Sequence, residues 1–255
     1  VLEEILRIKI KDEQFIRYII RMFKAGVLTS GELTVSTEGV VQGSCVSPIL
    51  SNILAHYVID TWFEESVKAH CRGKVELFRY SDDLVICCQT STDAERIKDA
   101  LSKRLKKFKL RMNEEKTKMV QFNRKENQAT SFNFLGFTFY WGRSQKGCKI
   151  PKVKTEGKRL RAKLKKVNEW ARSVRHKGDT HTIWKSFCKK LQGHIQYYGV
   201  SFNTKQVATF VYRAIGIMFY WLNRRSQKKS FTRAKFAGFM QRHPPPAVRV
   251  YHRLF

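Results

Sequence analysis

FRYSDDLVI, residues 78–86, is the stretch that decides the fold of this chain. Apolar runs at 75–78 and 84–88 lie on either side of an Asp82-Asp83 pair. Two short apolar runs around a polar turn predict a β-hairpin with both carboxylates at its tip. Asp-Asp pairs are also common in solvated surface turns, but such a turn does not require an apolar strand on each side.

The Asp82-Asp83 pair places two like charges side by side. Burying or half-burying such a pair is costly, and a bound divalent cation is the usual remedy. Carboxylates suit Mg²⁺, so both aspartates are candidate metal ligands. In a chain with a net charge of +29, this pair indicates a site where Mg²⁺ meets a polyanion, and therefore nucleic-acid chemistry.

The basic residues are distributed unevenly along the chain. Residues 1–150 carry 25 Lys and Arg against 18 Asp and Glu, whereas residues 151–255 carry 25 against 3. This break predicts two domains, 1–150 and 151–255, the second a phosphate-binding surface. A basic surface that is merely solvated, or drawn to an anionic membrane, is the alternative. Interleaved aromatic residues favour a folded nucleic-acid binder over a disordered tail: Trp170, Trp184, Tyr197, Tyr198, Tyr212 and Trp221.

Other features narrow the class of protein. No stretch approaches the ~18 consecutive apolar residues of a membrane span. The six cysteines show no zinc-site or disulfide spacing. We therefore expect an intracellular protein, of a bacterial cytoplasm or an organellar matrix. The chain begins at Val1 within a helical pattern, and we expect it to be part of a longer protein.

Apolar periodicity predicts an α+β chain. Helices are expected at 2–25 (with a break near Lys11), 49–69 and 92–108. Strands are expected at 33–35, in both arms of the acidic hairpin, at 119–122 and at 134–141. Beyond Pro151 the pattern is wholly helical, with helices near 158–175, 182–198 and 204–223.

Four short motifs occur in order: VQGSCVSPILSN at 41–52, FRYSDD at 78–83, NEEKT at 113–117 and FLGF at 134–137. Each is weak alone, but the ordered set is hard to obtain by chance. The set resembles reverse transcriptases, specifically the group II intron-encoded kind, also called maturases. Segments at 193–194, 197–200 and 222–227 resemble the thumb, or maturase, region of that family.

The resemblance covers essentially the whole chain and implies a right-hand polymerase fold. Residues 1–150 would form a partial palm, an antiparallel sheet with helices that lacks the fingers and the first catalytic Asp strand. Residues 151–255 would form a basic, all-α, three-helix thumb. Polymerases of this class carry another metal-ligand Asp on an earlier strand, and neither Asp12 nor Asp60 fits that position. No endonuclease signature follows Pro246.

The resemblance also implies RNA-directed DNA synthesis by two-metal nucleotidyl transfer, with two Mg²⁺ ions in the full-length enzyme. Asp82 would be the bridging ligand and Asp83 a supporting one. Lys116 would protonate or steady the pyrophosphate leaving group, unless it is a solvated loop lysine.

Further roles follow from the same resemblance. The expected nucleotide- and primer-binding residues are Gln42, Gly43, Ser47, Pro48, Tyr80, Leu135, Gly136 and Phe137. By the same resemblance, Leu135-Gly136-Phe137 would be the turn that grips the primer strand. An ordinary turn capped by Ser47, and a core strand with one bulge glycine at Gly136, are the alternatives. The expected RNA-binding residues are Arg159, Lys163, Lys165, Lys166, Arg175, Arg224 and Arg225.

The implied partners are intron RNA, an RNA-template/DNA-primer duplex and dNTPs, with a role in splicing and intron mobility. No membrane partner is expected, and the oligomeric state stays open. A non-catalytic RNA-binding splicing factor is the competing class, and retron, diversity-generating and CRISPR reverse transcriptases are alternatives among the enzymes. We expect these 255 residues to bind structured RNA or an RNA–DNA duplex but to polymerise poorly alone, because one metal ligand is missing.

Overall fold

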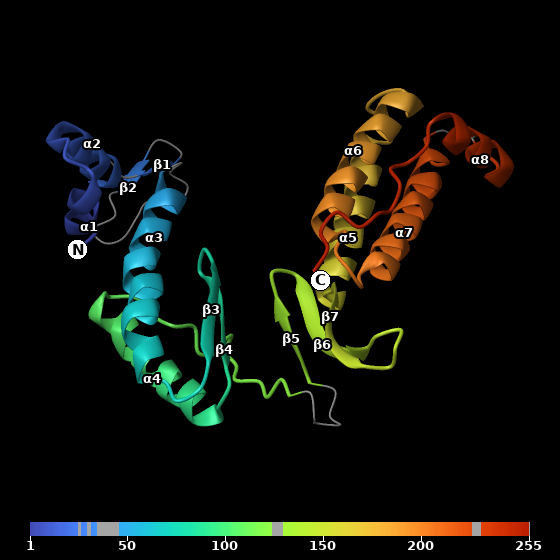
Figure 1. Ribbon diagram of the computed structural model, residues 1–255. Coiled ribbons are helices and arrows are strands. Elements are labelled where there is room, and N and C mark those ends of the chain that lie inside the picture. The colour runs from blue at the N-terminus through green and yellow to red at the C-terminus, as the bar shows by residue number, and fades with distance from the viewer. Residues whose placement is uncertain (25–26, 30–31, 35–45, 124–129, 226–230, 255) are drawn as a thin grey trace. The chain divides into compact units, whose positions relative to one another are not determined.

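The computed structural model describes residues 1–255 except 25–26, 30–31, 35–45, 124–129, 226–230 and 255. The chain forms two compact units, Val1–Met119 and Val120–Phe255. Both contain helices and antiparallel strands (Figure 1), which confirms the α+β prediction. The compact division precedes Pro151, and the functional division at that residue stays a prediction.

Apart from β1, which was not predicted, the N-terminal unit follows the predicted order of elements. They are α1 (Leu2–Lys9), α2 (Glu13–Lys24), β1 (Val27–Thr29), β2 (Glu32–Thr34), α3 (Ser47–Ala55), β3 (Val75–Tyr80), β4 (Asp83–Cys88) and α4 (Ser91–Lys107). After α3 the predicted single helix continues as two π-helical segments, η1 (His56–Thr61) and η2 (Phe63–Val67), and a 3-10 turn, η3 (Lys68–His70). The wider π turns change which side chains after α3 share a face.

The β3–β4 hairpin packs through one face only. Val75 is buried, and Leu77 and Ile86 pack against apolar residues of α4 and the π-helical segments. On the other face, Phe78 and Tyr80 are 56% and 68% exposed. Alternation along a strand produces this two-sided pattern, so the two predicted apolar strands contribute one face to the core.

Helix α4 begins with a reciprocal cap. The Thr90 hydroxyl accepts a hydrogen bond from the Asp93 backbone N–H, the arrangement that satisfies a free amide at a helix start. Buried Asp93 accepts in turn from the backbone of Gly73 and from the Thr90 hydroxyl, which keeps the pKa of its carboxyl below the ordinary value. The cap therefore joins α4 to the loop before β3.

The C-terminal unit contains a small sheet and four helices within its described residues. They are β5 (Ser131–Phe134), β6 (Phe137–Arg143), β7 (Lys149–Thr155), α5 (Gly157–Val174), α6 (Thr180–Tyr198), α7 (Thr204–Leu222) and α8 (Arg233–Arg242). The strands are antiparallel in the order β5-β6-β7. The predicted helices match α5, α6 and α7, and α8 follows them without having been predicted.

Three strand predictions are corrected. No strand forms at 119–122, where Met119 and Val120 are 49% and 41% exposed. The predicted strand at 134–141 is divided by a two-residue turn at Leu135 and Gly136. Pro151 lies within β7 and not at the start of the helical region. Because β7 is an edge strand of its sheet, the N–H that proline lacks is not needed there.

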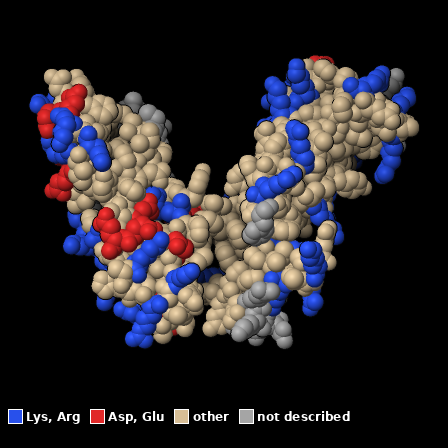
Figure 2. All heavy atoms as spheres, in the orientation of Figure 1, with Lys and Arg blue, Asp and Glu red and all other residues tan. Residues whose placement is uncertain are grey.

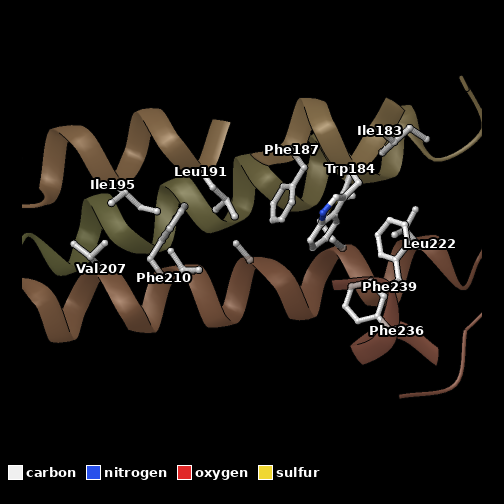
Figure 3. Packing of buried hydrophobic residues seen from close by; sticks show 14 of the residues in the cluster. Ile183, Trp184, Phe187, Leu191, Ile195, Val207, Phe210, Leu222, Phe236 and Phe239 are labelled. Atoms are coloured by element: carbon white, nitrogen blue, oxygen red, sulfur yellow. The ribbon is translucent and has the colours of Figure 1, made fainter. Parts of the chain in front are cut away.

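The helices of the C-terminal unit enclose the largest apolar cluster among the described residues. Figure 3 shows Trp184 and Phe187 of α6 facing Phe236 and Phe239 of α8 and Leu222 of α7. The Trp184 ring lies 5.7 Å from that of Phe236 and 5.5 Å from that of Phe239. None of the helices in the described part of the chain is long and apolar enough to cross a membrane.

The residues after α8 return to the loop between α6 and α7. The backbone N–H groups of Tyr251 and His252 donate to the Gly199 carbonyl at 2.6 and 3.1 Å. Val200 forms a parallel bridge with His252. A Cβ at Gly199 would lie 2.6 Å from the Arg249 carbonyl oxygen, so only glycine permits this approach.

Asn203, at the start of α7, connects three parts of this unit. It is fully buried; its side-chain oxygen accepts from the Thr155 N–H at 2.7 Å, and its amide donates to the Tyr198 carbonyl at 2.8 Å. Asn203→Ala removes the acceptor of the Thr155 N–H and leaves the Tyr198 carbonyl with only the Val200 N–H, so we expect a loss of about 1–3 kcal/mol in the free energy of unfolding.

Urea denaturation of this variant and of Asn168→Ala tests the expectation. Asn168 is exposed and accepts one hydrogen bond from the Trp221 indole, so its replacement should change stability by less than about 1 kcal/mol. Equal effects of the two substitutions would contradict the bridging role of Asn203.

Candidate active site

The two aspartates lie at the end of the β3–β4 hairpin, as predicted. Tyr80 pairs with Asp83, so Ser81 and Asp82 form a two-residue turn. Ser81 has φ 55°, in the left-handed region that non-glycine residues rarely adopt. Tyr80, Ser81, Asp82 and Asp83 are all exposed. The two carboxylates are therefore not half-buried, and the desolvation argument made from the sequence does not apply to them.

Arg79 fastens the hairpin tip to two helical segments. Its guanidinium donates to both carboxylate oxygens of Asp60 in η1, at 2.7 and 2.6 Å. It also donates to the Asn52 side chain of α3 and to the Ser81 carbonyl, each at 3.0 Å. The Arg79 side chain is only 11% exposed. One arginine thus fixes the acidic turn relative to α3, which contains residues 47–52 of the 41–52 motif.

The ion pair shifts the pKa of both partners. Hydrogen bonds from Arg79 hold the pKa of the Asp60 carboxyl below its ordinary value of 3.8, while partial burial acts against this shift. The same bonds raise the pKa of Arg79. Both groups stay charged over the whole neutral range, so this Arg79–Asp60 ion pair, here called the Arg79 clamp, is insensitive to physiological changes in pH.

Asp82 and Asp83 fit the ligand set that Mg²⁺ uses with nucleotides. Within the described residues neither carboxylate forms an ion pair, and Asp82 accepts one hydrogen bond, from the Ser81 hydroxyl. No group of three His, Cys, Asp or Glu in the described ranges is placed to hold a metal ion. Mg²⁺ is commonly bound by one or two carboxylates together with substrate phosphates, which two exposed neighbouring aspartates can provide.

The structure describes some, but not all, of the other predicted site residues of the N-terminal unit. Ser47 and Pro48 form the first turn of α3, where proline is well tolerated. Gln42 and Gly43 lie outside the described residues. Lys116 is exposed in a turn closed by hydrogen bonds to Asn113.

The Leu135-Gly136 pair forms a second tight hairpin turn, between β5 and β6. Leu135 and Gly136 have φ 50° and 77°, the positive values that a type I′ hairpin turn requires at both central residues. A bulky residue in this region is strained, and here the Tyr197 hydroxyl donates to the Leu135 carbonyl at 2.9 Å. The motif is therefore a turn supported by α6, and the bulge-glycine alternative is wrong.

Comparison with known proteins places this arrangement in a family. Residues 2–139, more than half of the chain, match the family described as "Reverse transcriptase (RNA-dependent DNA polymerase)". The chain belongs to the reverse transcriptase family. The matched residues of this reverse transcriptase include the acidic hairpin, the Arg79 clamp and the Leu135-Gly136 turn.

Two curated relatives of this reverse transcriptase are similar over part of their length. Protein YkfC of Escherichia coli (strain K12) is 29% identical over 174 residues, which cover 58% of this chain and 44% of that protein. The "Uncharacterized 91 kDa protein in cob intron" of Schizosaccharomyces pombe is 42% identical over 65 residues, 26% of this chain and 8% of that protein. The chain thus spans less than half the length of each.

The contact of Gly136 with α6 in this reverse transcriptase can be tested separately from its backbone conformation. A Cβ on Gly136 would lie 2.8 Å from the hydroxyl oxygen of Tyr198, whose side chain is 2% exposed and cannot easily move. Gly147 has a similar φ of 79°, but nothing lies within 4 Å of its Cβ position. We expect Gly136→Ala to lower the free energy of unfolding by roughly 1–3 kcal/mol more than Gly147→Ala.

Thermal unfolding of both variants measures this difference. Removing the hydroxyl in Gly136→Ala/Tyr198→Phe should recover most of it, because the obstructing oxygen is then absent. If the double variant is no more stable than Gly136→Ala, the contact with Tyr198 is not the cause.

Lys163 of α5 lies over the same aromatic pair. Its Nζ is 4.6 Å from the Tyr198 ring centroid and 5.7 Å from that of Tyr197. Burial, with Arg159 and Lys166 nearby, lowers the pKa of Lys163. His194 packs against Phe210 with ring centroids 3.6 Å apart, and burial lowers its pKa to about 3, so the imidazole is neutral.

The remaining basic residues of this reverse transcriptase fall into different settings. Arg159 lies 3.7 Å from Glu156, and Lys165 and Lys166 are exposed. Arg225 donates to Thr180 and to the Gly178 carbonyl, so it holds the end of α7 against the start of α6. Arg175 and Arg224 lie over aromatic rings of α7. In the view of Figure 2, blue side chains far outnumber red ones over α5–α8.

Sequence reasoning missed Arg79, Asn52 and Asp60 as site residues. From the sequence, Asp60 is weighed only as the first metal-ligand Asp, a position that it does not fit because it lies in a predicted helix. The available signal was the position of Arg79 inside the FRYSDD motif itself, since a charged residue on a half-buried strand requires a partner.

Proposed function

We propose that this chain is the palm and thumb portion of a group II intron-type reverse transcriptase. The protein copies RNA into DNA from dNTPs, and it binds its intron RNA to assist splicing and mobility. The observation that carries the proposal is the exposed Asp82-Asp83 pair, fixed by Arg79 to the helix of the 41–52 motif in a chain of this family. The printed name of the fission yeast relative, which places that protein in an intron, supports the intron assignment.

In this proposal the hairpin tip binds the reacting groups. Asp82 and Asp83 would hold Mg²⁺, which when bound supplies the positive charge that activates a primer 3′-hydroxyl and neutralises an incoming triphosphate. Tyr80, exposed beside the tip, packs near the primer terminus. Exposed Lys116 steadies the charge of the leaving pyrophosphate. Arg79 contributes by keeping the turn in one position.

The basic helices serve as the nucleic-acid-binding part. Residues 1–150 act as the palm and residues 151–255 as the thumb, with the Leu135-Gly136 turn and Phe137 gripping the primer strand. The net charge of the second region favours phosphate contacts, and the side chains proposed to make them are Arg159, Lys163, Lys165, Lys166, Arg175 and Arg224.

The substitution Asp82→Ala separates this proposal from a non-catalytic splicing factor. Both cDNA synthesis on an RNA template and splicing of the intron are measured in the protein that carries this chain. Loss of cDNA synthesis with splicing retained supports the enzyme. No change in either activity supports a protein that only binds RNA.

A further inference from the structure

A shallow groove runs between α5 and α7 in the C-terminal unit. Its volume is about 560 Å³, and Leu164, Gly216 and Ile217 form its apolar floor. Nothing lies within 4 Å of the Cβ position of Gly216, so the floor is open at its centre. This volume lies in the range of about 300–1,000 Å³ typical of ligand pockets, which is sufficient for a nucleobase.

Two aromatic rings, Tyr220 and Trp221, line the groove, and a guanidinium group lies over each of them. Tyr220 is 46% exposed, and the Arg224 guanidinium carbon lies 3.7 Å from its ring centroid. Arg175 lies 5.0 Å from the ring centroid of Trp221. The Trp221 indole N–H donates to the Asn168 side chain at 2.7 Å, which fixes the ring at the edge of the groove. Such planes are the platforms on which unpaired bases stack.

The charges around the groove are almost entirely positive. Helix α7 contains no Asp or Glu, and Glu169 is the only one in α5. Arg213 borders the groove and is exposed. Arg213 lies in the middle of α7, and Arg224 follows the C-cap residue Asn223 of that helix. Positive charge along the length of a stacking surface complements a phosphate backbone.

We propose that the α5–α7 groove binds unpaired nucleotides of single-stranded RNA, with a base stacked at Tyr220 and phosphates at Arg213 and Arg224. This groove would be one site of the proposed RNA-binding function, and the choice of RNA as its ligand rests on that function. A duplex is a poor occupant, because its bases are already stacked and do not present their faces to the protein. An apolar protein segment would leave the arginines without counter-charges.

The test is equilibrium binding of the 255-residue chain to a single-stranded RNA 12-mer with a central 2-aminopurine, and to a blunt RNA duplex of the same length. We expect Tyr220→Ala to weaken single-strand binding about 5- to 100-fold, the range for losing one stacked base, and to leave duplex binding unchanged. Tyr220→Phe keeps the ring and should stay within about twofold. Stacking on Tyr220 should quench the fluorescence of 2-aminopurine, and this quenching should be lost in Tyr220→Ala but kept in Tyr220→Phe.

Tyr212→Ala is the matched control, because Tyr212 is 80% exposed on the same helix but does not line the groove. For single-stranded RNA, Arg213→Ala should reduce the magnitude of the slope of log K against log salt concentration by about 0.7. Equal losses in Tyr212→Ala and Tyr220→Ala, or equal losses for single strand and duplex, would overturn the proposal. A stronger preference for single-stranded DNA would overturn the assignment to RNA. The polymerase proposal is tested in a separate assay, cDNA synthesis by Asp82→Ala, so a failure of that proposal is distinguished from a failure of this one.

Discussion

Replacing Asp82 by asparagine should reduce RNA-templated primer extension by roughly 10²- to 10³-fold. The substitution keeps the shape of the side chain but removes the charge proposed to hold Mg²⁺, and metal stabilisation of the transition state is worth several kcal/mol, with each 1.36 kcal/mol a factor of ten. Because Asp82 is exposed and accepts only a hydrogen bond from Ser81, the free energy of unfolding should change by less than about 0.5 kcal/mol.

Primer extension is measured on the protein that carries this chain, together with Mn²⁺ association by titration. Asp83→Asn should also reduce extension, since Asp83 is the supporting ligand. Asp99→Asn makes the same change of charge at an exposed position on α4 and should leave both measurements unaltered. If Asp82→Asn binds Mn²⁺ as the parent protein does, or Asp99→Asn reduces extension as much, the hairpin tip is not the metal site.

Replacing Arg79 by alanine should lower the free energy of unfolding of the N-terminal unit by about 2–3 kcal/mol. The substitution removes the paired bonds to Asp60 and those to Asn52 and Ser81, and it leaves a partly buried carboxylate without its partner. Chemical denaturation followed by circular dichroism measures the loss.

Arg7→Ala is the control for this prediction. Arg7 also forms ion pairs, with Glu3 and Glu13, but its side chain is 41% exposed, so its removal should change stability by about 0–1 kcal/mol. Equal effects of the two substitutions would contradict the clamp.

The pH dependence of folding stability provides a second test of the Arg79 clamp. Because the folded-state pKa of Asp60 is depressed, its contribution to stability is present above the unfolded value near 3.8 and is lost as the pH falls through the lower folded value. The difference in stability between the parent protein and Arg79→Ala should therefore be present at neutral pH and shrink below about pH 4.

The sequence predicts local elements of this chain well and long-range contacts poorly. The acidic hairpin follows from two apolar runs around a polar turn, and α4 and α5 follow from helical spacing of their apolar residues. Leu135 gave no turn signal, because leucine disfavours positive φ; its conformation depends on Tyr197, which is distant in the sequence. The segment at 119–122 has strand-like composition, and the Phe122 ring stacks on Trp141 of β6, but among the described residues its backbone pairs with no strand.

The same limit applies to the candidate site. The position of Asp82 and Asp83 could be predicted, because the hairpin places them by local pairing alone. The roles of Arg79 and Asn203 could not, because each depends on partners 19 to 48 residues away. The groove between α5 and α7 likewise forms only when two helices separated by α6 come together.

The hydrogen bonds from Tyr251 and His252 to Gly199 have a consequence for biosynthesis. A ribosome releases the N-terminal unit first, and that unit can complete its own packing while the helices are still being made. The loop between α6 and α7 acquires its last backbone partners only after residue 252 has left the exit tunnel. Nascent chains stalled before that point should therefore carry a bundle that opens more readily.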